Sequence, residues 1–367
     1  MTVSDCVVFG GGPAGCAAAI RLRQRAQADV LLVDRAAPAG RYQIGESAAP
    51  AVVPLLAELG LRQDLAELGH LPCYGNRSIW GGDAVNEQDF LFKGQGFGWH
   101  LDRATFDRQL RDQARECGVK FLDGLQLQRL GWLPKRQCWG LELSDELGGK
   151  RQLLTRSLVD ATGNRALIAQ RMGATRRRLD TLMAVAVLTK LPGGLDNLSL
   201  IEATEHGWWY AADIPGQRQV IAFMTDADIL KQQELAECGQ FSEQARRSEL
   251  LPSLLADLTD GSELFVYPAH SAYLDRVSGP GWLALGNAAM SLDPLTASGI
   301  HCALQDGIRG ADALLSYLDG DSSGLVGYAQ ATDQALRHYL SERLAYYRLE
   351  QRWPQATFWQ RRHQPTT

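Results

Sequence analysis

The chain has 367 residues, of which 45% are hydrophobic and 22% are charged, and its net charge at pH 7 is −5. This composition is typical of a globular chain long enough for two domains, and the negative charge argues against nucleic-acid binding. The chain opens without a signal segment, contains no run of apolar residues long enough for a membrane span, and has no Cys-x-x-Cys pair or paired histidine spacing, so we expect a cytoplasmic protein without a metal site.

The first predicted unit is a strand, a glycine-rich turn and a helix at residues 6–25. Residues 6–9 form an apolar strand, and Gly10, Gly12 and Gly15 give the spacing Gly-x-Gly-x-x-Gly. In such a unit the first glycine permits the tight turn, the second lets the backbone approach a pyrophosphate, and the third lets helix and strand pack closely. The spacing therefore predicts a dinucleotide site.

Two features on either side of the next strand complete this unit. Pro13 and Ala14 open the helix, whose free N–H groups and positive dipole end would face the phosphates. Asp34 follows the apolar strand 30–33, where a carboxylate can accept from ribose hydroxyls, and we expect Arg35 beside it to contact the cofactor as well. Which dinucleotide binds is not settled by this segment.

The middle of the chain alternates between helical and strand-like segments. We expect a helix after Pro50, a helix from Arg103 to Cys117 with Asp102 as its N-cap, and a helical region over 228–258. Short β-like runs are expected within 72–100, 119–130, 139–143 and 153–159, and residues 182–225 alternate like antiparallel strands.

A second glycine turn lies near residue 286. The apolar strand 282–285 ends in Gly286 and Asn287, Pro294 lies in the loop that follows, and Gly299 and Ile300 begin a long helix. Asn287 can hydrogen-bond a polyol chain, and the helix N-terminus can stabilise negative charge on a reduced ring. An ordinary strand-to-helix turn is the alternative interpretation.

The return to a buried strand near residue 285 indicates a discontinuous fold. We predict an α/β protein in which a Rossmann-like domain is interleaved with an antiparallel-sheet domain and followed by a C-terminal helical segment. The expected ranges are 1–71, 101–175 and 268–325 for the nucleotide-binding domain, 72–100 and 176–267 for the β-rich substrate domain, and 326–367 for the helical segment.

On these motifs the chain resembles the FAD-dependent monooxygenase and halogenase superfamily with the p-hydroxybenzoate hydroxylase-like fold, which also includes geranylgeranyl reductases. The resemblance implies FAD as the cofactor, held by the two glycine turns, and the segment 160–165 between them matches the mid-chain Asp-Gly region of the family. Asn287 stands where the family usually has an aspartate. Arg41 and the loop 45–50 resemble the loop beside the flavin, and Arg103 resembles an arginine that helps to hold the cofactor. An i,i+4 ion pair between Arg103 and Asp107 is the alternative.

The resemblance also bears on the chemistry. With no second nucleotide motif, we expect NAD(P)H or a separate reductase to reduce the FAD transiently, as in a monooxygenase. Glu46 and His301 are the polar candidates for catalysis near the ring, and structural contacts are the alternative role for both. Halogenases of this superfamily need a lysine shortly after the Gly-Glu loop, and residues 1–92 contain none, which disfavours halogenation. The aromatic run 208–210 resembles the halogenase tryptophan signature only loosely, and sheet packing is its alternative role.

The C-terminal residues 336–367 combine aromatic side chains with six arginines and two glutamates. We expect a helix across the domains with buried aromatics and solvated arginines, and a docking surface for a partner protein is the alternative. This tail, the Gly-Glu-Ser-Ala loop and the missing lysine resemble flavoprotein maturases of the LodB/GoxB type.

That resemblance implies hydroxylation of a peptidyl tryptophan in a partner amino-acid oxidase during cysteine tryptophylquinone biogenesis. A small-molecule aromatic hydroxylase, a geranylgeranyl-reductase-like oxidoreductase and a flavin-binding chaperone remain alternatives.

Overall fold

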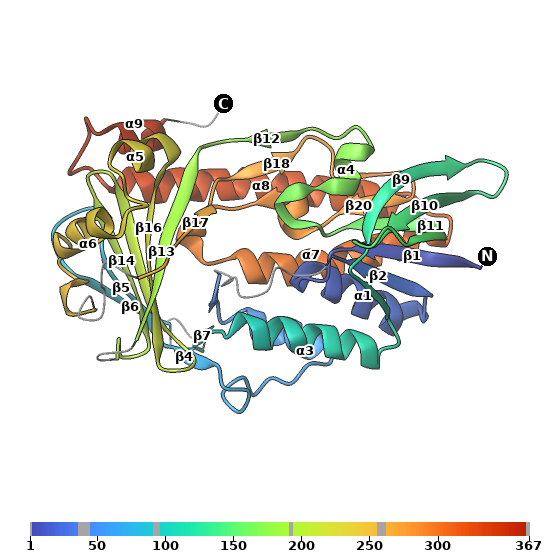
Figure 1. Cartoon of the computed structure of the whole chain (residues 1–367), viewed down its shortest axis with the longest axis horizontal. Helices are drawn as coiled ribbons and strands as arrows, with labels where there is room; N and C mark the ends of the chain where they lie inside the picture. Colours follow the sequence, from blue (N-terminus) through green and yellow to red (C-terminus); the bar gives the residue numbers. More distant parts are fainter. Residues whose placement is uncertain (1, 36–44, 91–95, 191–193, 255–261, 365–367) are drawn as a thin grey trace.

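The computed structural model describes residues 2–35, 45–90, 96–190, 194–254 and 262–364. Two large sheets lie toward opposite ends of the long axis, and the helices α7 (Gly299–Leu318) and α8 (Ser323–Leu349) run between them (Figure 1). The arrangement confirms the predicted α/β class.

An eight-stranded sheet carries the N-terminal glycine turn. Its central strands are parallel and rich in Val and Leu, because helices α1 (Pro13–Ala26), α3 (Arg103–Glu116) and α7 pack on the sheet and bury those side chains. The parallel part contains, in spatial order, β20 (Trp282–Ala284), β11 (Lys150–Asp160), β1 (Val3–Phe9), β2 (Val30–Asp34) and β8 (Lys120–Asp123). The antiparallel strands are β19 (Ser278–Gly279), β10 (Cys138–Ser144) and β9 (Gln126–Leu133).

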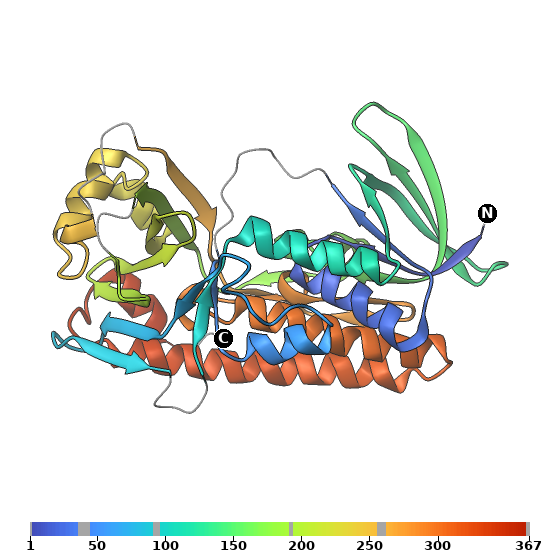
Figure 2. The same ribbon diagram turned by 90° about the horizontal axis from the view of Figure 1, so that it is seen from below.

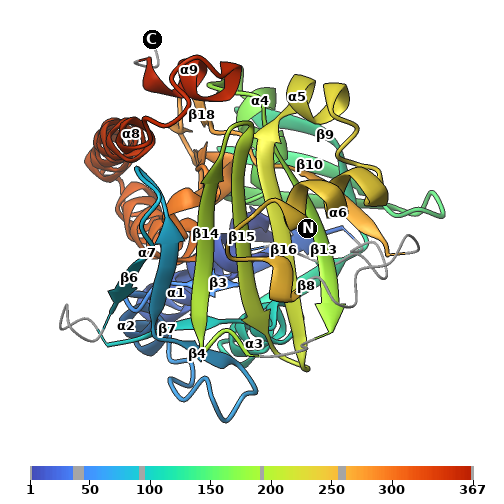
Figure 3. The same cartoon turned by 90° about the vertical axis from the view of Figure 1, so that its left-hand side faces the viewer.

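A seven-stranded sheet forms the other end of the molecule, and all its pairs are antiparallel except β14–β5. Its strands, in spatial order, are β17 (Leu264–Pro268), β13 (Leu182–Lys190), β16 (Arg218–Asp226), β15 (Gly207–Ile214), β14 (Leu198–Thr204), β5 (Gly75–Ile79) and β6 (Asn86–Asp89). The segment 228–258, expected to be helical, contains α5 (Ala227–Gln232) and α6 (Cys238–Arg246), and α6 covers the outer face of this sheet (Figure 3).

Two small sheets lie between the large ones. One contains β3 (Ser47–Ala48), β7 (Gly98–His100) and β4 (Leu71–Cys73), and the other contains β12 (Arg176–Arg178), β18 (Ala272–Leu274) and β21 (Met290–Ser291). The predicted segment 72–100 thus contributes strands to two different sheets, and the proposed domain boundaries stay a prediction. Short helices α2 (Val52–Glu58) and α4 (Leu167–Arg171) follow β3 and β11.

The C-terminal segment lies along most of the length of the molecule. Helix α8 starts beside the eight-stranded sheet and reaches the seven-stranded sheet, where α9 (Thr357–His363) folds back on it (Figures 1 and 2). The expectation of buried aromatics holds for Tyr347, Phe358 and Trp359. The expectation of solvated arginines is wrong for Arg343 and Arg362, which are buried because aspartates pair with them. Within the described ranges, no helix combines the length and apolar character needed to cross a bilayer.

Candidate active site

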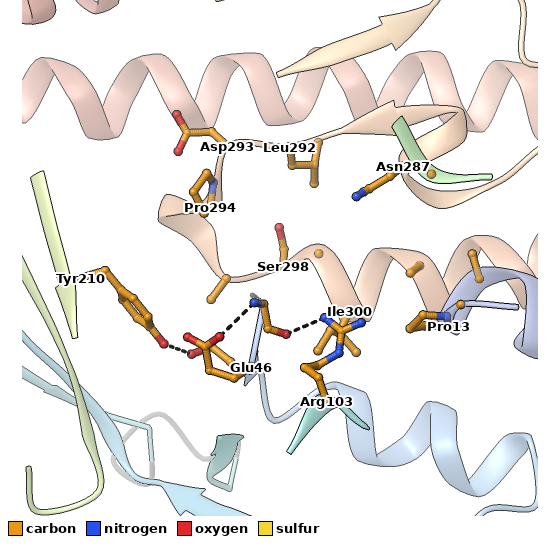
Figure 4. A pocket seen from close by; sticks show the side chains of 18 of the residues that line it. Pro13, Glu46, Arg103, Tyr210, Asn287, Leu292, Asp293, Pro294, Ser298 and Ile300 are labelled. Carbon is orange, nitrogen blue, oxygen red and sulfur yellow. Dashed lines mark hydrogen bonds between the residues drawn. The ribbon is translucent and has the colours of Figure 1, made fainter. Parts of the chain in front are cut away.

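A cavity of about 400 Å³ lies between the two large sheets. Its walls come from the start of α1, the β3 loop, strands β15 and β16, and the loop that leads into α7 (Figure 4). Pro13 and Asn287 lie at one end of this cavity and Tyr210 at the other. We call these the nucleotide end and the sheet end.

Backbone packing shapes the nucleotide end. Gly10 has φ +105°, and a Cβ there would lie 2.2 Å from the carbonyl oxygen of Ala161. A Cβ on Gly15 would lie 1.9 Å from the oxygen of Gly10, so the turn, α1 and β11 approach one another too closely for any side chain. A Cβ on Gly12 would meet nothing within 4 Å, since this glycine faces open space.

A second cavity of about 270 Å³ continues from the first, and both are lined by Gly12 and Ala161. Gly10, Asp34 and Arg35 line it, together with residues of β9 and α4. The Asp34 carboxylate accepts a hydrogen bond of 2.8 Å from Arg111, which also pairs with Asp123. The carboxylate is therefore held in place at the end of β2.

Two helix N-termini face the larger cavity. Pro13 and Ala14 of α1, and Gly299 and Ile300 of α7, are among its lining residues. Neither helix has an acidic residue in its first turn or a side-chain cap on its N-terminal N–H groups. Both dipoles therefore place positive potential in the cavity, which favours an anionic ligand.

Helices α1 and α7 contact the second glycine turn. A Cβ on Gly286 would lie 2.9 Å from the Cβ of Ala14, and the amide of Gly286 donates to Asp306 of α7. Burial raises the pKa of Asp306 to about 6. The carbonyl of Asn287 accepts from Arg176 at 2.9 Å, and its side chain points into the cavity (Figure 4).

The β3 loop contributes polar groups near the sheet end. The Glu46 carboxylate is 1% exposed and accepts from the amide of Gly45 at 2.9 Å. The hydroxyls of Ser47 and Tyr210 lie 2.7 Å apart, and burial, then the nearby Glu46, raise the pKa of Tyr210. Arg103 donates to the carbonyl of Gly45 and lines the cavity, and it also forms the alternative i,i+4 pair with Asp107 at 3.2 Å.

Strand β15 divides its aromatic side chains between two faces, as the two-residue period of a strand requires. Trp208 and Tyr210 line the cavity, together with Met224 of β16. Trp209 packs on the opposite face against Phe223 and Phe241. Sheet packing thus accounts for Trp209, whereas its two neighbours face the site.

The structure brings most predicted site residues together. The predicted residues that line the larger cavity are Gly12, Pro13, Ala14, Glu46, Arg103, Asn287, Pro294, Gly299 and Ile300. Gly10, Asp34 and Arg35 line the smaller cavity, while Gly15 and Gly286 pack behind the walls. His301 lines neither cavity, and Arg41 lies outside the described residues.

Sequence reasoning did not single out Asp293 as a lining residue, and it included Ser47 only as part of the loop 45–50. Asp293 is 2% exposed, and its position just before Pro294 in a loop was the only local signal. Burial raises the pKa of Asp293, and the neighbouring Arg343 opposes that change.

The two connected cavities fit an elongated dinucleotide. Gly12 could admit a pyrophosphate where the cavities meet, the smaller cavity could hold an adenosine beside Asp34, and the larger could hold a ring system. The open space at Gly12 and the two uncapped helix N-termini are the features that suit an anionic cofactor.

Comparison with known proteins also indicates a flavin-dependent enzyme. The tryptophan halogenase family matches residues 5–70 and 83–367. The putative FAD-dependent oxidoreductase LodB of Marinomonas mediterranea is 29% identical over 366 residues, which cover 98% of this chain and 96% of LodB. A tryptophan 2-halogenase of Chondromyces crocatus is 26% identical over 91% of this chain, which spans 64% of that enzyme.

Solved structures share the fold. The peptidyl tryptophan dihydroxylase QhpG, described as essential for tryptophylquinone cofactor biogenesis, has a TM-score of 0.80 and 23% identity, with 99% of this chain and 79% of QhpG covered. The myxobacterial chondrochloren halogenase CndH has a TM-score of 0.88 and 23% identity, with 99% and 86% covered. The chain belongs to the tryptophan halogenase family, and it is an FAD-dependent enzyme of that family.

Proposed function

We propose that this enzyme is a monooxygenase that hydroxylates the ring of a peptidyl tryptophan in a partner amino-acid oxidase, during biogenesis of cysteine tryptophylquinone. The observation that carries the proposal is the match to LodB along nearly the whole length of both chains, joined with the shared fold of QhpG. The missing lysine in residues 1–92 supports hydroxylation over halogenation.

The two cavities support a specific placement of the cofactor. We assign the pyrophosphate to the backbone of Gly12, Pro13 and Ala14, and the adenosine to the cavity beside Asp34 and Arg35. The ribityl chain would lie beside Asn287, whose amide group can bond its hydroxyls without adding charge. The start of α7 at Gly299 would then face the flavin ring and favour its anionic reduced form.

Bound FAD, reduced by NAD(P)H or by a separate reductase, supplies the chemistry that activates dioxygen and transfers one oxygen atom to the ring. The protein's own residues orient the substrate and exclude water. Trp208, Tyr210 and Met224 provide an apolar and aromatic surface for an indole at the sheet end. Glu46 is the candidate to accept a proton there, since its buried carboxylate lines the cavity, whereas His301 does not reach it.

Co-expression with the precursor of a quinone-dependent amino-acid oxidase tests this proposal. We expect mass spectrometry to show one or two added oxygen atoms on a precursor tryptophan, and none with Glu46→Gln or without this enzyme. Visible absorption must show that the wild-type enzyme and the Glu46→Gln variant both carry FAD.

An unmodified precursor beside a fully FAD-loaded enzyme would contradict the proposal. Incorporation of chlorine or bromine when halide is supplied would identify a halogenase. Oxidation of a free aromatic without any precursor would identify a small-molecule hydroxylase, and turnover without oxygen would identify a reductase.

A further inference from the structure

We propose that one face of the C-terminal helix α8 positions the sheet end of the cavity, with Tyr347 as the central positioning residue. The proposal rests on the function given above for the identity of the substrate, but its structural part concerns this chain alone. It assigns to residues 339–347 a role in holding the aromatic substrate rather than in binding FAD.

Three side chains of α8 converge on one aspartate. Tyr339, Arg343 and Tyr347 are four residues apart, so they lie on one face of the helix. The Tyr347 hydroxyl donates to Asp293 at 2.7 Å, and Arg343 contacts the same carboxylate oxygen at 3.4 Å. The amide of Asp293 donates to the Tyr339 hydroxyl at 2.7 Å.

The convergence fixes the loop that leads into α7. The Asp293 carboxylate points away from the cavity and toward α8, while Leu292, Pro294 and Ser298 of the same loop face inward (Figure 4). Asp293 has a side chain only 1% exposed, so its charge depends on these partners for compensation. The contacts with α8 therefore help to hold this loop in position.

Tyr347 also holds the opposite wall. The indole N–H of Trp208 donates to the Tyr347 hydroxyl at 3.1 Å, so one hydroxyl connects β15 to the Asp293 loop. Trp208 is 1% exposed, and burial without this partner would leave its N–H unsatisfied. Both groups that Tyr347 joins belong to residues that line the cavity.

At the nucleotide end α8 holds backbone rather than a lining side chain, since the Tyr328 hydroxyl donates to the carbonyl of Ala284 at 2.8 Å. The walls of this end are the glycine turns and the starts of α1 and α7, where backbone packing sets the geometry. Arg343 extends the network away from the cavity, because it pairs with Asp180 at 2.9 Å on its outer side. The network of Tyr339, Arg343 and Tyr347 therefore joins the sheet end to the C-terminal segment, and among the predicted FAD contacts it lies next to Pro294, the residue that follows Asp293.

The test is Tyr347→Phe, with Tyr346→Phe as the matched control. Tyr346 is 48% exposed and precedes Tyr347 on α8, so its variant removes the same hydroxyl from a residue outside the network. For Tyr347→Phe we expect an altered visible circular dichroism spectrum of bound FAD and an FAD dissociation constant within about threefold of the wild type. We also expect the KM for the oxidase precursor to rise about tenfold, with a smaller change in kcat. The control should match the wild type in all of these.

A Tyr347→Phe protein with an unchanged FAD spectrum and an unchanged KM would overturn the proposal. Equal losses of FAD affinity and precursor affinity would also overturn it, since they indicate a general structural role. If Tyr347→Phe does not fold, Arg343→Lys provides the same test with a smaller expected rise in KM of about threefold. If the wild type leaves the precursor unmodified, the proposed function fails, whereas the FAD spectrum still decides whether α8 positions the wall.

Discussion

Backbone packing shapes the nucleotide end of the cavity, whereas side chains form most of the sheet end. Gly10, Gly12 and Gly15 act within six residues of one another. The sheet end combines Glu46, Tyr210, Asp293 and, through Asp293, Tyr347. If the proposed function is correct, we expect backbone packing to govern FAD binding and side-chain contacts to govern substrate binding.

The largest effect is expected from Gly15→Ala. The new Cβ would lie 1.9 Å from the Gly10 carbonyl oxygen, and both groups are fixed by the fold. We expect the free energy of unfolding to fall by about 3 kcal/mol and FAD to be lost. Urea unfolding and visible absorption measure the two changes.

Gly12→Ala is the matched control for that variant. Its Cβ would meet no protein atom within 4 Å, so stability should stay within about 0.5 kcal/mol of the wild type. FAD affinity should nevertheless fall by about ten- to 100-fold, because the methyl group enters the space assigned to the pyrophosphate. Unchanged FAD affinity in this variant would contradict the assignment of the pyrophosphate to the Gly12 turn.

The contrast between the two ends also explains what the sequence could predict. The glycine turns, the strand 282–285 and the helix starting near Gly299 were predictable because each depends on neighbouring residues. The pairing of Tyr347 with Asp293 was not, because it joins residues separated by 54 positions through the packing of α8. The solvated arginines were mispredicted for the same reason, since Asp226 reaches Arg362 only in the folded chain.

Asp306→Asn should have a smaller effect, and one that depends on pH. The pKa of Asp306 is raised from 3.8 to about 6 by burial, so the native state holds its proton more tightly than the unfolded state. Its ionisation therefore lowers stability as pH rises from about 4 to about 6, and the cost persists above that range. The asparagine can still accept from the Gly286 amide.

We expect Asp306→Asn to raise the free energy of unfolding by about 1–2 kcal/mol at pH 7.5, with most of that gain absent at pH 4. Urea unfolding of both proteins at the two pH values gives the comparison. An equal gain in the free energy of unfolding at both pH values would indicate that packing, rather than the charge of the Asp306 carboxylate, causes the effect.

The smallest effect is expected from Tyr210→Phe at the sheet end. The variant keeps the aromatic ring and loses the 2.7 Å contact with Ser47. We expect the KM for the oxidase precursor to rise about fivefold, which corresponds to about 1 kcal/mol, with FAD affinity unchanged. Steady-state kinetics and FAD titration test this prediction. An equal loss of FAD affinity would contradict the separation between the nucleotide end and the sheet end.

The position of Tyr347 in the chain has a consequence for the order in which the enzyme is made. The glycine turns, β20 and α7 all precede residue 319, so a nascent chain contains these proposed FAD-binding elements before α8, which also binds the Ala284 carbonyl through Tyr328, has been translated. Domains generally fold as units while synthesis proceeds from the N-terminus. We therefore expect the proposed FAD-binding elements to be made before α8, which is the last long helix and contacts both ends of the cavity.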